Sequence, residues 1–487
     1  MLALLPVLAL FSYGALCVPT DLIVRDTSTD LVARSIVDDF NNFISSASDK
    51  INVDDIKQGI LPDFFSNIPD EQEIKDQLGL NDTQIDELPL EVLNIPGYAN
   101  YTGRGWNLRI HGQAYKQPLS PRATVSNETL DKAANVFLPD LDIDQLQPHE
   151  KDNARNLTSA ILSLPQEDVQ LVFTLNVAEG QNISGGWNGE IQWGKLTDSR
   201  GEIDGFVQLP ASANDLPPGN TTTQITRLDI HTNGTDTGNA TGYLVPNQGI
   251  TIISDIDDIL RVTKIYQPQE GLFNSFARDF VPWLNMPSIY DTWSTQHPEN
   301  PYHFHYLTTT PEQATRVYMQ FIYHTYPVGS FDTRPLNFTT VDQTFSVRKT
   351  LLNKIFETFP QRRFVLVGDT TNNDVMKDYP ELVTRFPGQV ACILLRNTSA
   401  TDSGNKFPYD TSGFKNLKQE QYMFFNIPDD LTGLDFTRGD CRNDSAQLGT
   451  VEFGWQGLPF DISSAISRKG TATVWSALFM TVLAVFW

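Results

Sequence analysis

An apolar run in the sequence ends abruptly in three aspartates. The stretch "TIISDIDDILRVTK" has the texture of a buried strand up to Ser254, and Asp255, Asp257 and Asp258 follow directly. Negative charge gathered at the end of a buried strand is unfavourable unless a cation lies among the carboxylates. The cluster is therefore either a metal and phosphate site or a solvated acidic turn.

An Asp-x-Asp pair at a strand end suits covalent phosphoryl transfer. The first carboxylate can attack phosphorus and form an aspartyl-phosphate. The second, two positions on and on the same side, can protonate the leaving oxygen and later activate water. A metal ion would offset the repulsion between carboxylate and phosphate, and a hydroxyl with a cationic side chain would steady the non-bridging oxygens.

Further polar residues follow later β-type runs. Thr308 ends "YHFHYLT", Asp369 ends "RRFVLVGD", and Asp374 comes five residues after it. Ligands of open parallel sheets bind beyond the carboxyl ends of the strands, so these groups are expected to converge with the first aspartates. Oxygen ligands without His or Cys favour Mg²⁺. A calcium loop is excluded, because its sixth and twelfth positions would be Leu260 and Tyr266.

The three motifs "SDIDD", "YLTTTP" and "FVLVGDTTNND" resemble those of the fungal actin-patch-type phosphatidate phosphatases, distant relatives of the lipins within the haloacid-dehalogenase-like superfamily. The resemblance runs from about Tyr243 to Asn397 and is fainter in the preceding region. The motifs keep their order, with 53 residues between positions 255 and 308 and 61 between 308 and 369. The resemblance implies a Rossmann-like parallel sheet and a Mg²⁺-dependent phosphatidate phosphatase.

By this resemblance, Asp255 is the nucleophile and Asp257 the general acid and base. Thr308 stands where the family usually has a phosphate-binding serine. The implied metal site comprises Asp255, Asp257 through its backbone carbonyl, Asp369 and Asp374. Asp258 is expected to be structural.

Two positions depart from the family pattern. Ile259 follows the aspartates where Thr is common. The phosphate-binding lysine is expected near Arg348, with Lys349 adjacent, so either residue is a candidate for phosphate binding. Arg does not freely replace Lys, because its planar fork has a different geometry.

Strands and helices alternate from Gly249 onward, which predicts βαβ units and a parallel sheet covered on both faces. We assign residues 248–430 to this α/β catalytic domain of haloacid-dehalogenase-like type. Residues 99–247 contain short alternating runs separated by Gly, Asn and Pro, typical of an antiparallel, sandwich-like β-rich domain. Its tryptophans Trp106, Trp187 and Trp193 are expected in the core rather than in a ligand platform.

Residues 18–98 form an acidic region with helical periodicity, including "DEQEIKDQLGLNDTQIDELPLEVL". Residues 1–17 have the apolar core of a secretory signal peptide. Residues 431–464 are a C-terminal extension, and residues 465–487 form an apolar segment typical of a cleaved lipid-anchor (GPI) signal, with Ser463 or Ser464 as the attachment residue. A retained tail anchor and a C-terminal core helix are the alternatives.

Export to the cell surface would expose the chain to glycosylation and to oxidation. Cys392 and Cys441 could form one disulfide there, since Cys17 would leave with the signal. Glycosylation acceptor motifs occur at eleven positions: Asn81, Asn100, Asn127, Asn156, Asn182, Asn220, Asn233, Asn239, Asn337, Asn397 and Asn443.

The composition supports a globular enzyme rather than a nucleic-acid-binding protein. With 40% hydrophobic residues, 19% charged residues and a net charge of -24, the chain would be repelled by a polyanion. Together with the family resemblance, which implies the lipid substrate, the sequence predicts an exported phosphatidate phosphatase whose partner is a phospholipid substrate at a membrane surface. The alternatives are a phosphatase of another phosphomonoester and a catalytically decayed surface-binding protein.

Overall fold

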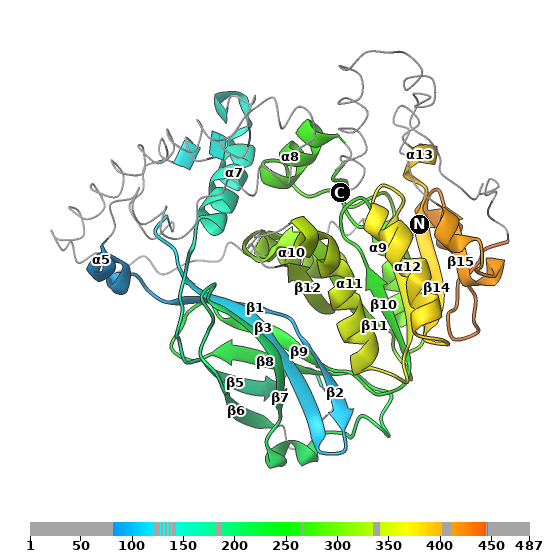
Figure 1. The fold of residues 1–487 in the computed structure, drawn as a ribbon, viewed down its shortest axis with the longest axis horizontal. Helices are drawn as coiled ribbons and strands as arrows, with labels where there is room; N and C mark the ends of the chain where they lie inside the picture. Colours follow the sequence, from blue (N-terminus) through cyan, green and yellow to red (C-terminus); the bar gives the residue numbers. More distant parts are fainter. Residues whose placement is uncertain are drawn as a thin grey trace, which may run out of the picture.

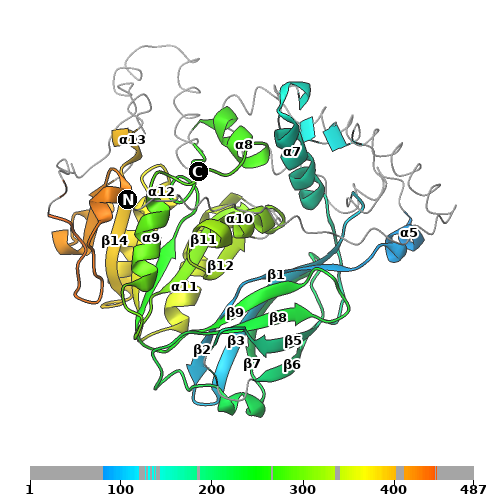
Figure 2. The ribbon, with the colours of Figure 1, turned by 180° about the vertical axis from the view of Figure 1, so that it is seen from behind.

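The computed structural model of the protein describes residues 81–446, except for 120–126, several positions between 128 and 142, 182, 184–186, 265–266, 335–340, 402–410 and 445. The predicted signal peptide, the region before residue 81 and the C-terminal anchor segment lie outside the described residues. Among the described helices, none is long and apolar enough to cross a membrane. Figures 1 and 2 show two β-sheets side by side, with helices around the second.

The first sheet has nine strands in the order β1-β3-β2-β9-β8-β5-β6, with β4 and β7 also paired to β3. All its pairs are antiparallel except β2 with β9. The strands are β1 (Glu91–Ile95), β2 (Tyr98–Thr102), β3 (Gly105–Lys116), β4 (Leu164–Pro165), β5 (Val172–Val177), β6 (Asn188–Gln192), β7 (Glu202–Gln208), β8 (Thr226–Thr232) and β9 (Asn239–Leu244).

This sheet curls around a core of its own instead of forming the two separate sheets of the sandwich prediction. Trp193, just beyond β6, lies so close to Gly205 of β7 that a Cβ on the glycine would come within 3.1 Å of the indole. The residue that follows β6, at one end of the strand order, thus packs against β7. Trp106 and Trp187 are also buried in this core, as expected.

Two helices precede or interrupt the first sheet: α5 (Asp82–Glu87) and α7 (Pro148–Ile161). The helical prediction for the N-terminal region is correct at α5 but wrong at Glu91–Ile95, which forms β1. Every residue of β1 is buried, so it shows none of the alternation that marks a strand with one solvent face. The β-rich unit therefore begins before residue 99.

The second sheet is entirely parallel, with the order β12-β11-β10-β13-β14-β15. The α/β prediction is confirmed. Numbered along the chain, this is the 3-2-1-4-5-6 order of doubly wound sheets. Its strands are β10 (Ile250–Ser254), β11 (His303–Pro311), β12 (Ser330–Arg334), β13 (Arg363–Asp369), β14 (Val390–Arg396) and β15 (Tyr422–Phe425).

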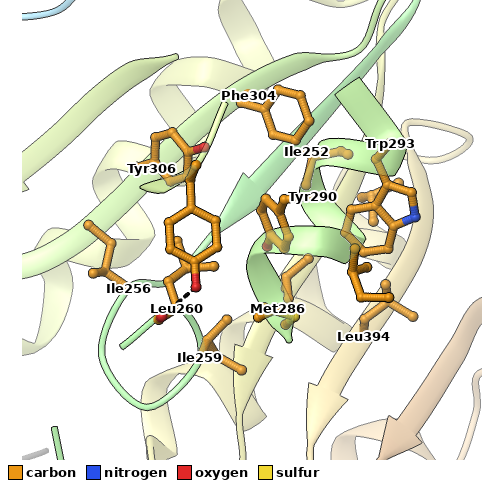
Figure 3. Packing of buried hydrophobic residues seen from close by; sticks show 14 of the residues in the cluster. Ile252, Ile256, Ile259, Leu260, Met286, Tyr290, Trp293, Phe304, Tyr306 and Leu394 are labelled. Atoms are coloured by element: carbon orange, nitrogen blue, oxygen red, sulfur yellow. Dashed lines mark hydrogen bonds between the residues drawn. The ribbon is translucent and has the colours of Figure 1, made fainter. Parts of the chain in front are cut away.

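Helices cover both faces of this sheet. They are α8 (Pro268–Phe276), α9 (Met286–Thr295), α10 (Glu312–Thr325), α11 (Val341–Thr358), α12 (Asn373–Arg385) and the short α13 (Thr398–Thr401). Successive residues of a strand point to opposite faces of the sheet and so are buried in two separate cores. Ile252 joins α9 and α10 in one core, and Ile253 joins α11 and α12 in the other. Figure 3 shows the first core, where Tyr290 and Trp293 of α9 pack beside Ile252 and Leu394.

The predicted disulfide between Cys392 and Cys441 is present, with a sequence separation of 49. Both cysteines are buried in the core on the α9 side of the sheet. The bond ties the segment after β15 back to β14.

The two sheets share their hydrophobic cores. Tyr98 of β2 and Tyr243 of β9 pack among the residues of α11 and α12, and Leu93 of β1 joins the core around α9 and α10. A buried ionic group also joins the sheets. Arg109 Nε lies 2.7 Å from Asp204 within the first sheet, and its Nη1 lies 2.5 Å from Asp332 of β12.

Candidate active site

The first aspartate lies at the point where the strand order of the parallel sheet reverses, between β10 and β13. The backbone N–H of Asp255 donates to Val367 of β13 at 2.9 Å, so the ladder continues to this residue. Such a switch point is the usual ligand site of an open α/β sheet, because neighbouring loops diverge there. Ser254 is fixed just below, accepting a 2.7 Å hydrogen bond from the Tyr290 hydroxyl.

Asp255 is buried and paired with Arg348. Its Oδ1 accepts a 2.9 Å bond from the N–H of Ile256, and its Oδ2 lies 3.0 Å from Arg348 Nη2. Burial raises the pKa of Asp255 to about 6, although the charge of Arg348 opposes the rise. At neutral pH the group is thus an ionised carboxylate with a raised basicity, which suits a nucleophile.

Asp257 is held by three groups around one oxygen. Its Oδ1 accepts hydrogen bonds from Thr263 Oγ1 at 2.7 Å and from the Tyr318 hydroxyl at 3.0 Å, and Arg261 Nε lies 3.4 Å away. Its Oδ2 accepts a long bond of 3.5 Å from Thr308 Oγ1. The structure therefore brings the predicted Asp257 and Thr308 together.

Arg261, Thr263 and Tyr318 were not foreseen from the sequence. The cation of Arg261 is fully buried between two rings, 3.6 Å from the centre of Phe280 and 4.8 Å from that of Tyr318. The position of Arg261 four residues after Asp257 was a usable signal. Tyr318 lies 61 residues away on α10, and nothing in the motifs points to it.

Asp258 has a structural part, as expected. It adopts the left-handed conformation, with φ of 57°, which is uncommon for a residue with a side chain. Its Oδ1 accepts the backbone N–H groups of Thr263 at 3.2 Å and Lys264 at 2.7 Å. These bonds close the turn that carries Asp257.

Ile259, the departure from the family pattern, is an apolar core residue with no exposed surface. Figure 3 shows it beside Leu260 and Met286. A hydroxyl at this position would have to find a partner among apolar side chains, so the isoleucine fits its surroundings.

Asp369 is the last residue of β13, and only one of its two carboxylate oxygens accepts hydrogen bonds from the described residues. Its Oδ1 accepts bonds from the N–H of Thr371, at 2.7 Å, and from the Thr371 hydroxyl. Its Oδ2 is buried and has no hydrogen-bond partner in the described part of the chain. Burial, with the charges of Asp258 and Asp255, raises the pKa of Asp369 to about 7.

Asp374 lies in the first turn of α12. The N-cap of this helix is Asn372, whose side chain accepts from the N–H groups of Asp374 and Val375, so Asp374 is not the cap. Burial raises the pKa of Asp374 to about 6, with Arg348 opposing and Asp378 adding to the rise. The helix packs tightly on the end of β13, since a Cβ on Gly368 would lie 2.8 Å from Val375.

Arg348 and Lys349, the two candidates for phosphate binding, have different surroundings. Arg348 is 1% exposed, and its Nε and Nη1 have no hydrogen-bond partner among the described residues. Lys349 instead forms an ion pair with Glu381, at 2.7 Å, on the partly exposed side of α11. The structure brings Arg348 to Asp255 and leaves Lys349 outside the cluster.

The donor set is chemically suited to a hard cation. Asp255, Asp369 and Asp374 are carboxyl groups with raised pKa values, and a buried anion without a partner, such as Asp369 Oδ2, would gain from a cation. Within the described residues, however, no three His, Cys, Asp or Glu side chains are already close enough to hold a metal ion. The residues fit Mg²⁺ by type and burial, but their side chains are not close enough together in the described part of the structure to enclose the ion.

Two histidines of the parallel sheet have partners of their own. His303 and His305 are buried in β11, and Ser330 bonds to both. Burial lowers the pKa of His303 well below its usual value. Their partners lie within the parallel sheet: Ser330 for both, and Asp332 of β12 for His305.

Residues 250–397 match the family described as "Phosphatidate phosphatase APP1, catalytic domain". A match to phosphatidate phosphatase APP1 of Saccharomyces cerevisiae is 27% identical over 205 residues and covers 41% of this chain and 34% of that protein. The resemblance inferred from the motifs is thus confirmed, for a segment that spans about a third of the yeast relative.

Among solved structures, two Bacteroides uniformis β-glucuronidase 2 structures, one covalently bound to an aziridine compound and the other a calcium-binding mutant, are 9% identical. They have TM-scores of 0.16 and 0.17, cover 66% and 67% of this chain, and are covered to 37% and 38% of their own length.

Proposed function

We propose, on the premise that residues 250–397 belong to the APP1-type phosphatidate phosphatase family, that this protein hydrolyses a lipid phosphomonoester, phosphatidate, to diacylglycerol and phosphate. The observation that carries the proposal is the buried pair of Asp255 with Arg348 beside Asp257, at the switch point of a parallel sheet inside the matched segment. The haloacid-dehalogenase-like assignment and the roles below are part of the proposal.

In the first step, a carboxylate oxygen of Asp255 attacks phosphorus. The bond between phosphorus and the glycerol oxygen breaks, and Asp257 gives that oxygen its proton, so that diacylglycerol leaves and an aspartyl-phosphate remains. Three groups hold Asp257 Oδ1, which leaves Oδ2, beside Thr308, to carry the proton.

In the second step, Asp257 takes a proton from water, and the water oxygen attacks phosphorus. The bond to Asp255 breaks, which restores the carboxylate and releases phosphate. The Nε and Nη1 of Arg348 are buried without hydrogen-bond partners among the described residues. They are donors available to phosphate oxygens, where charge accumulates.

Mg²⁺ would be held by Asp255, Asp369, Asp374 and the backbone carbonyl of Asp257. When bound, it would neutralise the charge of the phosphate and of the carboxylates around it. The orphaned Oδ2 of Asp369 supports this assignment.

We further propose that the protein is exported, glycosylated and attached to the outer membrane face through Ser463 or Ser464. The disulfide supports an oxidising compartment. Six of the eleven acceptor asparagines have exposed side chains: Asn81, Asn127, Asn156, Asn220, Asn233 and Asn239. Asn100 is less suited to a glycan, because its Nδ2 donates to the backbone carbonyl of Thr358 at the end of α11.

The test is phosphate release from phosphatidate in detergent micelles with Mg²⁺, comparing the wild-type protein with Asp255→Asn. We expect the variant to lose at least about a thousandfold in rate, as for other removed nucleophiles, and EDTA to abolish wild-type release. Asp144→Asn is the matched control, since Asp144 pairs with Lys151 on the surface, and it should leave the rate unchanged.

Each other outcome points to a different conclusion. Release that persists in Asp255→Asn would contradict the assignment of the nucleophile. Release from a small aryl phosphate alone would keep the mechanism and replace the substrate. No release from either would favour a decayed binding protein.

A further inference from the structure

The loop 279–285, between α8 and α9, carries the two most exposed large apolar side chains of the described residues. Leu284 is 59% exposed and Val281 is 55% exposed. Apolar side chains scattered singly over a surface are ordinary. Two of them three positions apart, on one loop beside a candidate active site, call for a reason.

This loop is held rigidly against the turn that carries Asp257. The N–H of Val262 donates to the carbonyl of Val281 at 2.9 Å, and the N–H of Trp283 donates to Leu260 at 3.0 Å. Phe280 covers Arg261, which faces Asp257. The loop therefore lies at the same edge of the sheet as the catalytic carboxylates.

Buried residues anchor the loop on the sheet while the two apolar side chains project. The indole of Trp283 is 5% exposed, with Arg396 of β14 4.0 Å from its centre. Asn285 Nδ2 donates to Asp429 at 2.6 Å. Leu284, between these anchors, has a φ of 50°, a conformation that costs an ordinary side chain energy unless its surroundings impose it.

A third exposed apolar residue, Ile427, lies at this edge of the parallel sheet. It follows β15 directly, two residues before Asp429, and is 39% exposed. The exposed Val328, by contrast, precedes β12, so it lies at the opposite, amino-terminal edge. Leu196 lies after β6 in the first sheet.

We propose that Val281 and Leu284 insert into the lipid surface that presents the substrate and so seat the catalytic edge on a bilayer. The inference rests on the proposed function, because the phosphate of a long-chain phosphatidate lies at a membrane surface. A net charge of -24 gives the chain no general attraction to anionic lipid. Docking must then come from buried apolar area, which these two side chains supply.

The first experiment compares two substrates with the same headgroup, using the full-length protein. One is long-chain phosphatidate in phosphatidylcholine vesicles, and the other is short-chain phosphatidate below its critical micelle concentration. In the double variant Val281→Asn, Leu284→Gln, we expect kcat/KM on vesicles to fall on the order of tenfold, since two large apolar groups no longer leave water. Hydrolysis of the monomeric substrate should stay within about twofold.

The matched control is Val328→Asn, Leu196→Gln, with the same chemical changes away from this edge. It should leave both rates unchanged. Unchanged hydrolysis of vesicles by the loop variant, or an equal loss on both substrates, would overturn the proposal. Wild-type protein inactive on both substrates would contradict the proposed function instead.

The second experiment does not depend on activity. An environment-sensitive fluorophore is attached to Leu284→Cys and, as control, to Leu196→Cys, and phosphatidylcholine vesicles are added. We expect a blue shift of the emission at position 284 and none at position 196. No shift at position 284 would overturn docking by this loop, even if another part of the chain brings the protein to the vesicles.

Discussion

At the scale of single residues, the candidate site is a balance between buried carboxylates and two buried arginines, Arg348 and Arg261. Arg348 lies against Asp255 at 3.0 Å, and both side chains are almost completely buried. Asp369 and Asp374 lie close enough for their charges to raise the pKa of Arg348 further. Arg348 lies against Asp255 and Arg261 near Asp257, whereas Asp369 Oδ2 is buried without a hydrogen-bond partner among the described residues. That carboxylate oxygen is the physical basis for expecting a metal.

Arg348 is predicted to be needed for the several N–H donors of its planar guanidinium and not only for its charge: Nη2 faces Asp255, while Nε and Nη1 are available to phosphate. In Arg348→Ala, Asp255 would remain buried without its partner, so we expect about a hundredfold loss of kcat/KM or more. Arg348→Lys restores the charge but not the planar set of N–H donors, and should recover part of the rate. Steady-state kinetics on a soluble phosphate ester measure both effects.

Lys349→Ala is the neighbouring control. Its ion pair with Glu381 is partly exposed, and such pairs contribute little, so the rate should not change. A rate that depends on Lys349 and not on Arg348 would reverse the assignment of the phosphate-binding residue.

At the scale of elements, the site depends on how α12 starts. Asn372 caps the helix. Asp369 lies three residues before the cap and Asp374 two residues after it. The start of this helix therefore sets the distance between the two predicted metal ligands.

Asn372→Ala is predicted to lower the free energy of unfolding by about 1 kcal/mol, the usual effect of losing an N-cap. We also expect the variant to need a several-fold higher Mg²⁺ concentration for half-maximal activity, because Asp374 would no longer be fixed relative to Asp369. Chemical denaturation and a Mg²⁺ titration of activity measure the two effects. Asn372→Ser keeps a capping oxygen and should restore both, while equal behaviour of the two variants would show that the cap does not position Asp374.

The sequence predicted most of the elements that carry the site and few of the contacts among them. The strands before Asp255 and Asp369 were recognisable because buried parallel strands are short apolar runs. Two strands, β12 and β15, were missed, since "SFDTR" is polar for a strand and "YMFF" is only four residues long. The helix α7 was also missed, because it lies within residues 99–247, which were predicted to be β-rich from their short alternating runs.

The contacts around Asp257 could not have been predicted, because they depend on tertiary geometry. Tyr318 reaches Asp257 from a helix that crosses the sheet. Arg348, in contrast, was one of two neighbouring candidates, and helical geometry decided between them: adjacent positions on a helix face different directions. The sequence could narrow the choice to two residues but not to one.

At the scale of the whole molecule, the two sheets behave as one structural unit. Apolar residues of the first sheet are buried in both cores of the second, and Arg109 joins Asp204 to Asp332 across the contact. His305 lies 3.2 Å from the other oxygen of Asp332. Near residue 248 the chain therefore passes from one sheet to the other, but the two sheets are packed together and share buried core residues.

This buried group predicts a loss of stability in acid. Burial alone would raise the pKa of Asp332, but Arg109 and His305 outweigh it and lower the pKa to about 2. The unfolded value is about 3.9, so the stabilising contribution is present above about pH 4 and is lost as the pH falls towards 2. The thermal unfolding midpoint of the wild-type protein should fall across this window.

Asp332→Asn should be destabilised by roughly 3–5 kcal/mol at neutral pH, because it leaves Arg109 buried with less opposing charge. Its unfolding midpoint should then fall less steeply than that of the wild type between pH 4 and 2, since one titrating carboxylate is gone. Asp144→Asn, on the surface, should follow the wild-type curve. Parallel curves for the wild type and Asp332→Asn would show that Asp332 does not contribute to the acid lability.

The disulfide also determines how mechanical force would enter the protein. Tension applied to the chain beyond Cys441 is carried by the covalent bond into Cys392 of β14, so β15 and the turns between residues 393 and 440 are bypassed and bear no load. In the reduced protein the same pull would act first on β15, an edge strand of four residues paired only with β14. Pulling on the C-terminus should therefore unravel the reduced protein at lower force than the oxidised one, and the difference in extension would report the chain enclosed between Cys392 and Cys441, whose sequence separation is 49.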